Sequence, residues 1–103
     1  WYSEDGSLWK QTTPGAGWST RFGHTAVSYD RRLWILGGQQ AGPRLNDVWS
    51  SKDGKTWLRH NEHADWAKRS SAGAVSLDDS LWLLAGEHQW RQGIADIWQM
   101  GSD

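Results

Sequence analysis

The feature that most constrains the fold is an internal repeat. The sequence of 103 residues superposes on itself at an offset of 48 positions, the distance from Trp9 to Trp57. The tryptophan pairs that coincide at this offset are Trp1 with Trp49, Trp9 with Trp57, Trp18 with Trp66 and Trp34 with Trp82. The register slips by one residue between 87 and 93, after which "NDVW" meets "ADIW". A period of this length is typical of stacked or radial repeat architectures.

Each period contains four short extended segments with turn signals between them. In the first period we expect strands at 24–29, 32–38, 46–51 and 56–60, and the first two recur at 72–77 and 80–86. Bulky apolar residues that end on glycine, as in "RLWILGG", are typical of a strand buried on both faces. Helical periodicity is not evident anywhere. Four strands in each repeat predict an all-β chain made of antiparallel β-propeller blades.

The spaced residues of the first repeat resemble a known family. An arginine precedes the first strand, "GHTAV" lies in it, "RLWILGG" ends on a double glycine, and "NDVW" and a later tryptophan follow. This order is similar to the kelch repeat, in particular its tryptophan-rich bacterial form, which is related to the galactose oxidase propeller. The second repeat departs from it, because "GH" becomes Ser71-Ala72 and the double glycine becomes Ala85-Gly86.

The resemblance implies structural roles for several residues. In kelch repeats the glycine pair allows close packing near the blade centre, and the late tryptophan packs between blades. The stretch "SSKDGKTW", which is repeated as "YSEDGSLW", also resembles the Asp-box turn of sialidase propellers, shortened by one residue. We expect its aspartates to accept hydrogen bonds from turn N–H groups. The predicted structural motif residues are Asp5, Trp9, Gly37, Gly38, Asp53, Trp57 and Gly86.

Counting segments along the chain gives about two blades. Residues 1–22 supply the outer strands of a split blade, 23–60 a complete blade, and 61–103 the inner three strands of another split blade. An isolated pair of blades would expose sheet edges. Because Trp1 and Trp98 occupy equivalent repeat positions, the first segment of one copy could continue the last blade of another. We therefore expect a homo-oligomeric ring, a trimer with six blades first and a tetramer with eight second. The competing explanation is a fragment of a longer propeller.

Composition narrows the classes of partner. Lysine and arginine total 11 against 12 acids, so the chain has no net field to attract nucleic acid or an anionic membrane. No apolar run approaches the roughly 20 residues that cross a bilayer, and the first residues resemble no targeting signal. We expect a soluble protein of unknown compartment. The chain has no cysteine, which excludes disulfides, thiolate chemistry and the Cys-crosslinked copper site of galactose oxidase.

The sequence predicts no catalytic residue, cofactor or metal. His60 and His63 have a spacing that could bind a metal only with a third ligand, and in a polar loop we interpret them as solvated histidines. A glycosidase needs two carboxylates on either side of the scissile bond, one with a raised pKa, whereas the acids here lie mostly in turns. The favoured function is a non-enzymatic scaffold or binding module for protein or glycan. The alternative is a fragment of a sialidase-like or other glycan-active enzyme.

Loops on a rigid scaffold are where binding residues concentrate. In kelch domains two sets of connections meet on one face around the central channel: those between the fourth and first strands, and those between the second and third. Tryptophans and arginines in these connections are our candidates for a ligand-binding loop face, although the recurrence of Trp18 as Trp66 favours a structural role for that pair. The candidates are Trp18, Arg21, Arg44, Trp66, Arg69, Trp90 and Arg91.

Overall fold

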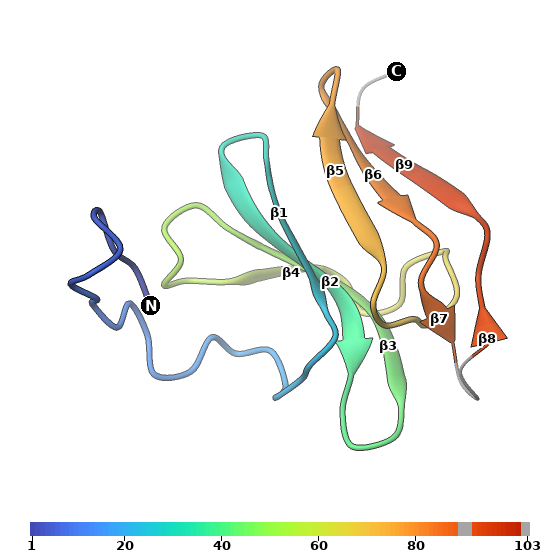
Figure 1. Ribbon diagram of the computed structural model, residues 1–103, viewed down its shortest axis with the longest axis horizontal. Helices are drawn as coiled ribbons and strands as arrows, with labels where there is room; N and C mark the ends of the chain where they lie inside the picture. The colour runs from blue at the N-terminus through green and yellow to red at the C-terminus, as the bar shows by residue number, and fades with distance from the viewer. Residues whose placement is uncertain (89–91, 102–103) are drawn as a thin grey trace.

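A computed structural model describes residues 1–88 and 92–101 (Figure 1). In these residues the chain consists of strands, turns and loops, without a helix. The predicted all-β class is therefore confirmed. No helix in the described residues is long and apolar enough to cross a membrane.

The first sheet has four antiparallel strands in chain order, β1-β2-β3-β4. Their bounds are Thr25–Tyr29 for β1, Arg32–Gln39 for β2, Arg44–Ser51 for β3 and Leu58–Asn61 for β4. The strands lie within three residues of the predicted segments at each end. The tight β1–β2 turn uses Asp30 and Arg31 at φ 51° and 58°, left-handed values that suit a two-residue hairpin.

The second sheet has three antiparallel strands in the order β5-β6-β9. β5 spans Gly73–Leu77, β6 spans Ser80–Leu84 and β9 spans Ile97–Gly101. A small hairpin of β7 (Glu87–His88) and β8 (Gln92–Gly93), which the sequence did not predict, is inserted between β6 and β9. β9 corresponds to β3 of the first sheet. No strand pairs with its outer side within the described residues.

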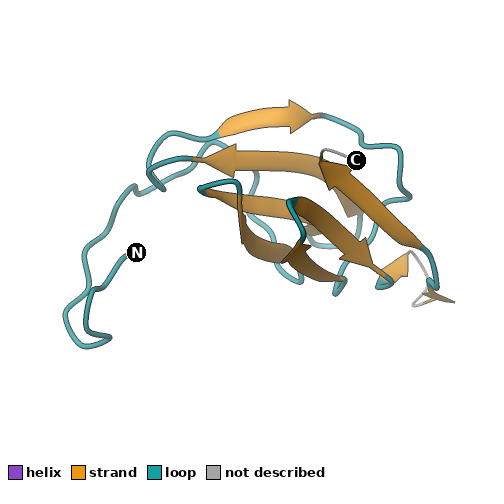
Figure 2. Ribbon diagram, turned by 90° about the horizontal axis from the view of Figure 1, so that it is seen from above, coloured by secondary structure: helices purple, strands orange, loops and turns teal. Residues whose placement is uncertain are grey.

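The two sheets pack side by side through their first strands, β1 and β5, as Figures 1 and 2 show. Thr25 Oγ1 donates to the carbonyl of Ala72 at 2.8 Å, and the Tyr29 hydroxyl donates to the carbonyl of Asp79 at 2.9 Å. Apolar side chains from both sheets and their linker form one core cluster. Its buried members are Trp34, Leu36, Val48, Trp66, Leu81 and Leu83.

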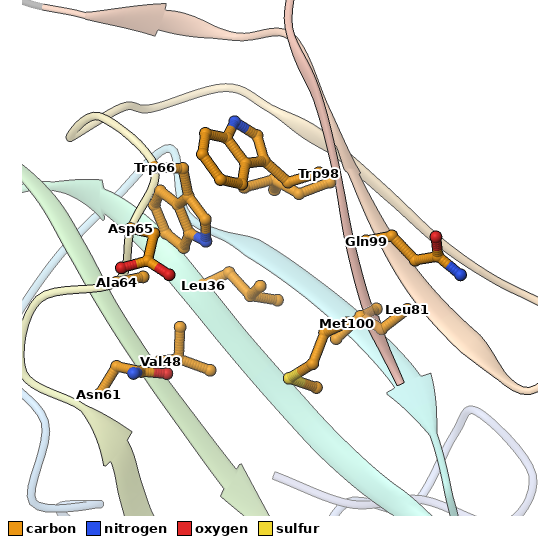
Figure 3. Close-up of a pocket in the computed structure, with 11 residues that line it drawn as sticks. Leu36, Val48, Asn61, Ala64, Asp65, Trp66, Leu81, Trp98, Gln99 and Met100 are labelled. Atoms are coloured by element: carbon orange, nitrogen blue, oxygen red, sulfur yellow. The ribbon is translucent and has the colours of Figure 1, made fainter. Parts of the chain in front are cut away.

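A cavity of about 170 Å³ remains between the sheets (Figure 3). The apolar side chains of Leu36 and Val48 line it from the first sheet, and Trp98 and Met100 line it from β9. Trp66 of the linker lies close to Trp98 at one end. The space between the blades is thus an apolar seam formed by the repeated strands and the linker that joins them.

The N-terminal segment extends away from both sheets (Figures 1 and 2). Its backbone closes one bridge, in which Tyr2 and Lys10 exchange two N–H···O=C bonds of 2.8 Å. Its large apolar side chains lie in solvent, with Trp1 76% and Leu8 77% exposed. A cavity of about 720 Å³, lined by Trp1 and Trp34 among others, lies between this segment and the first sheet. This segment therefore forms a bridged turn whose large apolar side chains lie in solvent.

Candidate functional site

Arg21 lies at the entrance to the first blade, and its guanidinium is fully engaged. Its side chain is 1% exposed. Nη1 and Nη2 donate to the two carboxylate oxygens of Asp47 at 2.7 and 2.8 Å. Nη1 also donates to the carbonyl of Gly37, while Nε and Nη2 donate to the carbonyl and hydroxyl of Ser19. All five N–H donors of the guanidinium therefore have an acceptor.

Arg69 makes the same arrangement in the second blade. Nη1 and Nη2 donate to Asp96 at 2.6 and 2.9 Å, Nη1 donates to the carbonyl of Ala85, and Nε donates to that of Ala67. The arginine side chain is again 1% exposed, but the Asp96 side chain is 38% exposed, against 15% for Asp47. Each arginine thus connects the linker that precedes its sheet to a carbonyl group and an aspartate of that sheet's strands or loops.

The ion pairs hold both carboxylates in the charged form. Partial burial opposes ionisation of Asp47, but hydrogen bonds from Arg21 and Trp49 and the charge of Arg21 outweigh it, so its pKa lies below the usual range. Hydrogen bonds from Arg69 lower the pKa of Asp96 to about 2. A glycosidase acid needs the opposite shift. These buried pairs therefore favour a structural role for Arg21 and Arg69 over the ligand-binding role that the sequence predicts.

The tryptophans of the two linkers pack on these arginines. The guanidinium carbon of Arg21 lies 5.8 Å from the ring centroid of Trp18, and that of Arg69 lies 5.5 Å from the ring of Trp66. Trp18 also meets Trp57 edge-on at 5.7 Å. Trp66 is 7% exposed and belongs to the core cluster. The two indoles act as packing between elements, which favours the structural alternative for this pair.

Glycines at the ends of the second strand of each repeat allow close approach of neighbouring segments. At Gly37, φ is 60° and a Cβ would lie 2.9 Å from the carbonyl oxygen of Arg69. At Gly38, φ is 103° and a Cβ would lie 2.9 Å from the Cβ atom of His24. Gly86, at φ 109°, has the same relation to the Ser70 carbonyl oxygen. These contacts are the physical reason for glycine at these positions.

The two Asp-box-like turns are built in the same way. One carboxylate oxygen of Asp53 accepts from the N–H groups of Lys55 and Thr56, both at 2.9 Å, as the sequence predicts. Asp5 accepts from Ser7 and Leu8 at 2.8 and 3.0 Å. Backbone hydrogen bonds lower the pKa of both aspartates. Their acceptor capacity is used in the turn.

The histidines of β4 and the following loop point to different partners. His60 stacks on Trp34 at 4.8 Å, and its Nε2 shares a hydrogen bond of 2.6 Å with the Ser50 hydroxyl. His63 Nδ1 shares one of 2.9 Å with Asn46 Oδ1. Ser50 is fully buried, which keeps substrate from a serine–histidine pair of this kind. Within 1–88 and 92–101, no three histidine, aspartate or glutamate side chains gather as a metal site.

The connections between blades meet at one end of the sheets. Backbone bridges join Phe22 to Gln39, Leu45 to Arg69, and Ser70 to Glu87. These bridges bring each linker beside the β2–β3 loop or the β6–β7 connection that it crosses. We call this region the loop end, and define it as residues 18–23, 39–45, 66–71 and 86–88. Of the predicted ligand-binding residues, Arg44 lines a cavity there, and Trp90 and Arg91 lie outside the described residues.

The loop end also contains residues that the sequence did not predict as ligand-binding. The cavity that Arg44 lines, about 460 Å³, also includes Lys68 and His88. In the first repeat the positions equivalent to Lys68 and His88 are occupied by Thr20 and Gln40. The signal that could have found them is a change of residue type between the repeats, from threonine to lysine and from glutamine to histidine.

The antiparallel sheets are consistent with propeller blades. Each sheet has an arginine clamp, the pair Arg21 with Asp47 or Arg69 with Asp96. Residues 20–50, from the linker through β3, match the family model of the Kelch motif. The chain therefore carries a kelch repeat, which confirms the predicted resemblance. No curated protein matches the sequence.

Proposed function

We propose that the chain is a non-enzymatic kelch-type module that binds a partner protein through the loop end. The observation that carries this proposal is the contrast between the two repeats. Residues that build the blade recur, such as Arg21 and Arg69 with their aspartates. Residues of the loop end change character, as from Thr20 to Lys68. A position that the fold does not need to keep the same is available for recognition.

Four aspartates of the blades and turns are engaged in contacts that hold the fold together. Asp47 and Asp96 pair with buried arginines, and Asp5 and Asp53 close turns. The pKa values of all four are lowered, so none is suited to donate a proton near neutral pH. This supports binding over catalysis. A panel of fluorogenic glycosides tests the point, and turnover of any of them would contradict it.

The binding proposal is tested by selecting a random peptide library on the immobilised chain. Selected peptides should lose affinity for Ala41→Arg, which adds bulk and charge to an exposed position of the β2–β3 loop. They should keep affinity for Thr56→Arg, the same addition in the exposed β3–β4 turn. Peptides that lose affinity only for Thr56→Arg would place the binding face at the wrong end of the blades.

We also propose that blades of separate copies associate into a ring, a trimer of six blades first and a tetramer of eight second. The proposal is supported by the exposed apolar side chains of the edge strand β9: Ile97 is 62%, Trp98 37% and Met100 38% exposed. In the first sheet the equivalent strand, β3, is covered by β4. A longer chain that carries further repeats would make the same contacts within itself. Light scattering after size-exclusion chromatography tests the ring, and a monomer that unfolds cooperatively would overturn it.

A further inference from the structure

The loop end contains a basic pocket, and two of its residues, Lys68 and His88, differ from their counterparts in the first repeat. Pro43 and Arg44 at the start of β3, Ala67 and Lys68 of the linker, and His88 of β7 line a cavity of about 460 Å³. A volume of this size falls in the range of small-ligand sites, roughly 300–1,000 Å³. The backbone around it is fixed by the bridges from Leu45 to Arg69 and from Ser70 to Glu87.

Arg44 has a hydrogen-bond donor to spare in the wall of this pocket. Its side chain is 12% exposed, and Nη2 donates to Glu87 Oε1 at 3.0 Å. Nη1 makes a longer bond of 3.4 Å to the Gly42 carbonyl. The Nε–H is buried and has no acceptor among the described residues. A buried donor without a partner destabilises the fold, so an acceptor supplied by a ligand would relieve that penalty.

The first repeat serves as an internal control for the basic residues. The bridge from Phe22 to Gln39 is the counterpart of the bridge from Ser70 to Glu87, so both repeats place the linker beside the same part of the blade. The first repeat builds this backbone with Thr20 and Gln40, where the second has Lys68 and His88. The positive charge of Lys68 is therefore not required by the backbone.

The charges of the pocket fit one negative group. Arg44 and Lys68 carry two positive charges, and Glu87 balances one of them. The whole chain has a formal net charge of −1, which gives no long-range attraction for a polyanion such as nucleic acid. A single carboxylate matches the remaining charge. Arginine and lysine bind carboxylates with hydrogen bonds about twice as strong as neutral ones.

We propose that this pocket binds the carboxylate of an acidic side chain on the partner protein, which rests on the proposed loop-end binding function. The carboxylate pairs with the exposed ammonium of Lys68 and accepts the Nε–H of Arg44. Because Nε is buried, the carboxylate reaches it only after a side chain of the pocket moves. Glu87, whose side chain is 34% exposed, holds Arg44 by one hydrogen bond. His88 also lines the pocket and offers a ring N–H donor.

The proposal is tested by nuclear magnetic resonance on the isotopically labelled chain in its native assembly. The probe is the capped peptide acetyl-Gly-Glu-Gly-amide, and the control is acetyl-Gly-Gln-Gly-amide, at constant ionic strength. The Glu peptide should shift the Arg44 Nε–Hε resonance saturably, and the Gln peptide should not. Equal shifts from both peptides would overturn the proposal, as would a larger saturable shift from inorganic phosphate.

Substitutions separate the pocket from general electrostatics. Lys68→Thr, which restores the residue type of the first repeat, should weaken binding of the Glu peptide roughly tenfold, the loss of about one charge-assisted hydrogen bond. Lys55→Thr makes the same charge change in the β3–β4 turn and should leave affinity unchanged. Equal losses in the two variants would contradict a local site. Library peptides that bind the loop end without any acidic residue would overturn the carboxylate pocket and leave the loop-end function standing.

Discussion

The two arginine clamps are built to one plan but are shielded differently. Arg21 donates five hydrogen bonds to Asp47, Ser19 and Gly37, whereas Arg69 donates four, because Ala67 replaces the serine. The Asp47 side chain is 15% exposed and that of Asp96 is 38% exposed. In the first blade β4 covers β3, while the outer side of β9 has no strand in the described residues. The repeated residues therefore determine that the arginine–aspartate pair forms, and the presence of a neighbouring strand determines how far its carboxylate is exposed to water.

The largest effect is expected from removing the arginines. Arg21→Ala leaves the Asp47 carboxylate partly buried without its partner, and breaking a buried ion pair costs roughly 3–5 kcal/mol. Arg69→Ala should cost less, because water reaches Asp96 more easily. Urea unfolding of both variants measures the difference. A larger loss in Arg69→Ala would contradict the link between shielding and energy.

Should Arg21→Ala fail to fold, Arg21→Lys and Arg69→Lys provide a milder pair. Lysine keeps the charge but cannot make the bidentate contact with a carboxylate. The order of the two losses should be the same as for alanine. The unfolding midpoints of these variants therefore test the comparison even where the alanine variants cannot be purified.

A second contrast concerns the glycine of the first blade and the alanine at its counterpart. Gly37 and Ala85 have similar left-handed φ values, 60° and 55°. Only at Gly37 does the next linker approach, with the Arg69 carbonyl 2.9 Å from where a Cβ would be. Gly37→Ala should cost roughly 1–3 kcal/mol from strain and displacement of that linker. In Ala85→Gly the relief of left-handed strain and the added freedom of the unfolded chain nearly cancel.

Thermal unfolding of the two variants separates the causes. If the left-handed backbone alone mattered, the two exchanges would have equal and opposite effects. A much larger change at Gly37 isolates the contribution of the close contact. Equal magnitudes would contradict the packing explanation.

Much of the blade could be predicted from the sequence. The 48-residue offset and the strand-length apolar runs placed β1, β2, β3, β5 and β6 within about two residues, because alternation and turn chemistry are local properties. The β7–β8 hairpin was not predicted, since two-residue strands leave no periodicity to detect. Its pairing depends on the bridge from Ser70 to Glu87, which is a tertiary contact.

The candidate site was harder to predict than the fold. Arginines in loops indicated a ligand face, but Arg21 and Arg69 turn inward to aspartates 26 and 27 residues further along the chain. The recurrence of "ND" and "AD" before a tryptophan was the available signal, because those aspartates are the partners. Lys68 and His88 were not predicted, because a lysine and a histidine in polar connections are ordinary surface residues until the two repeats are compared position by position.

The stability of the second arginine clamp depends on pH through the carboxylate of Asp96. Arg69 lowers the pKa of Asp96 to about 2 from an ordinary value of 3.8. The stability that this pair contributes is fully present above about pH 4 and is lost as the pH falls toward 2. Asp96→Asn should remove this part of the acid dependence, a smaller effect than loss of the arginine. Unfolding midpoints between pH 5 and 2.5 measure it, and parallel curves for the variant and the parent chain would contradict it.

The smallest effect tests the one acceptor that distinguishes the clamps. Ala67→Ser restores a hydroxyl at the position where Ser19 accepts from Arg21 Nη2 at 3.1 Å. It should stabilise the second blade by about 0.5 kcal/mol, the lower end of the range for a hydrogen bond, because this contact lies at the surface. Ser19→Ala should cost a similar amount in the first blade. If the gain from Ala67→Ser disappears when Arg69→Lys is also present, the gain comes from a hydrogen bond to the guanidinium. If the gain persists in the double variant, it comes from the linker backbone, and the parallel between the two clamps is broken.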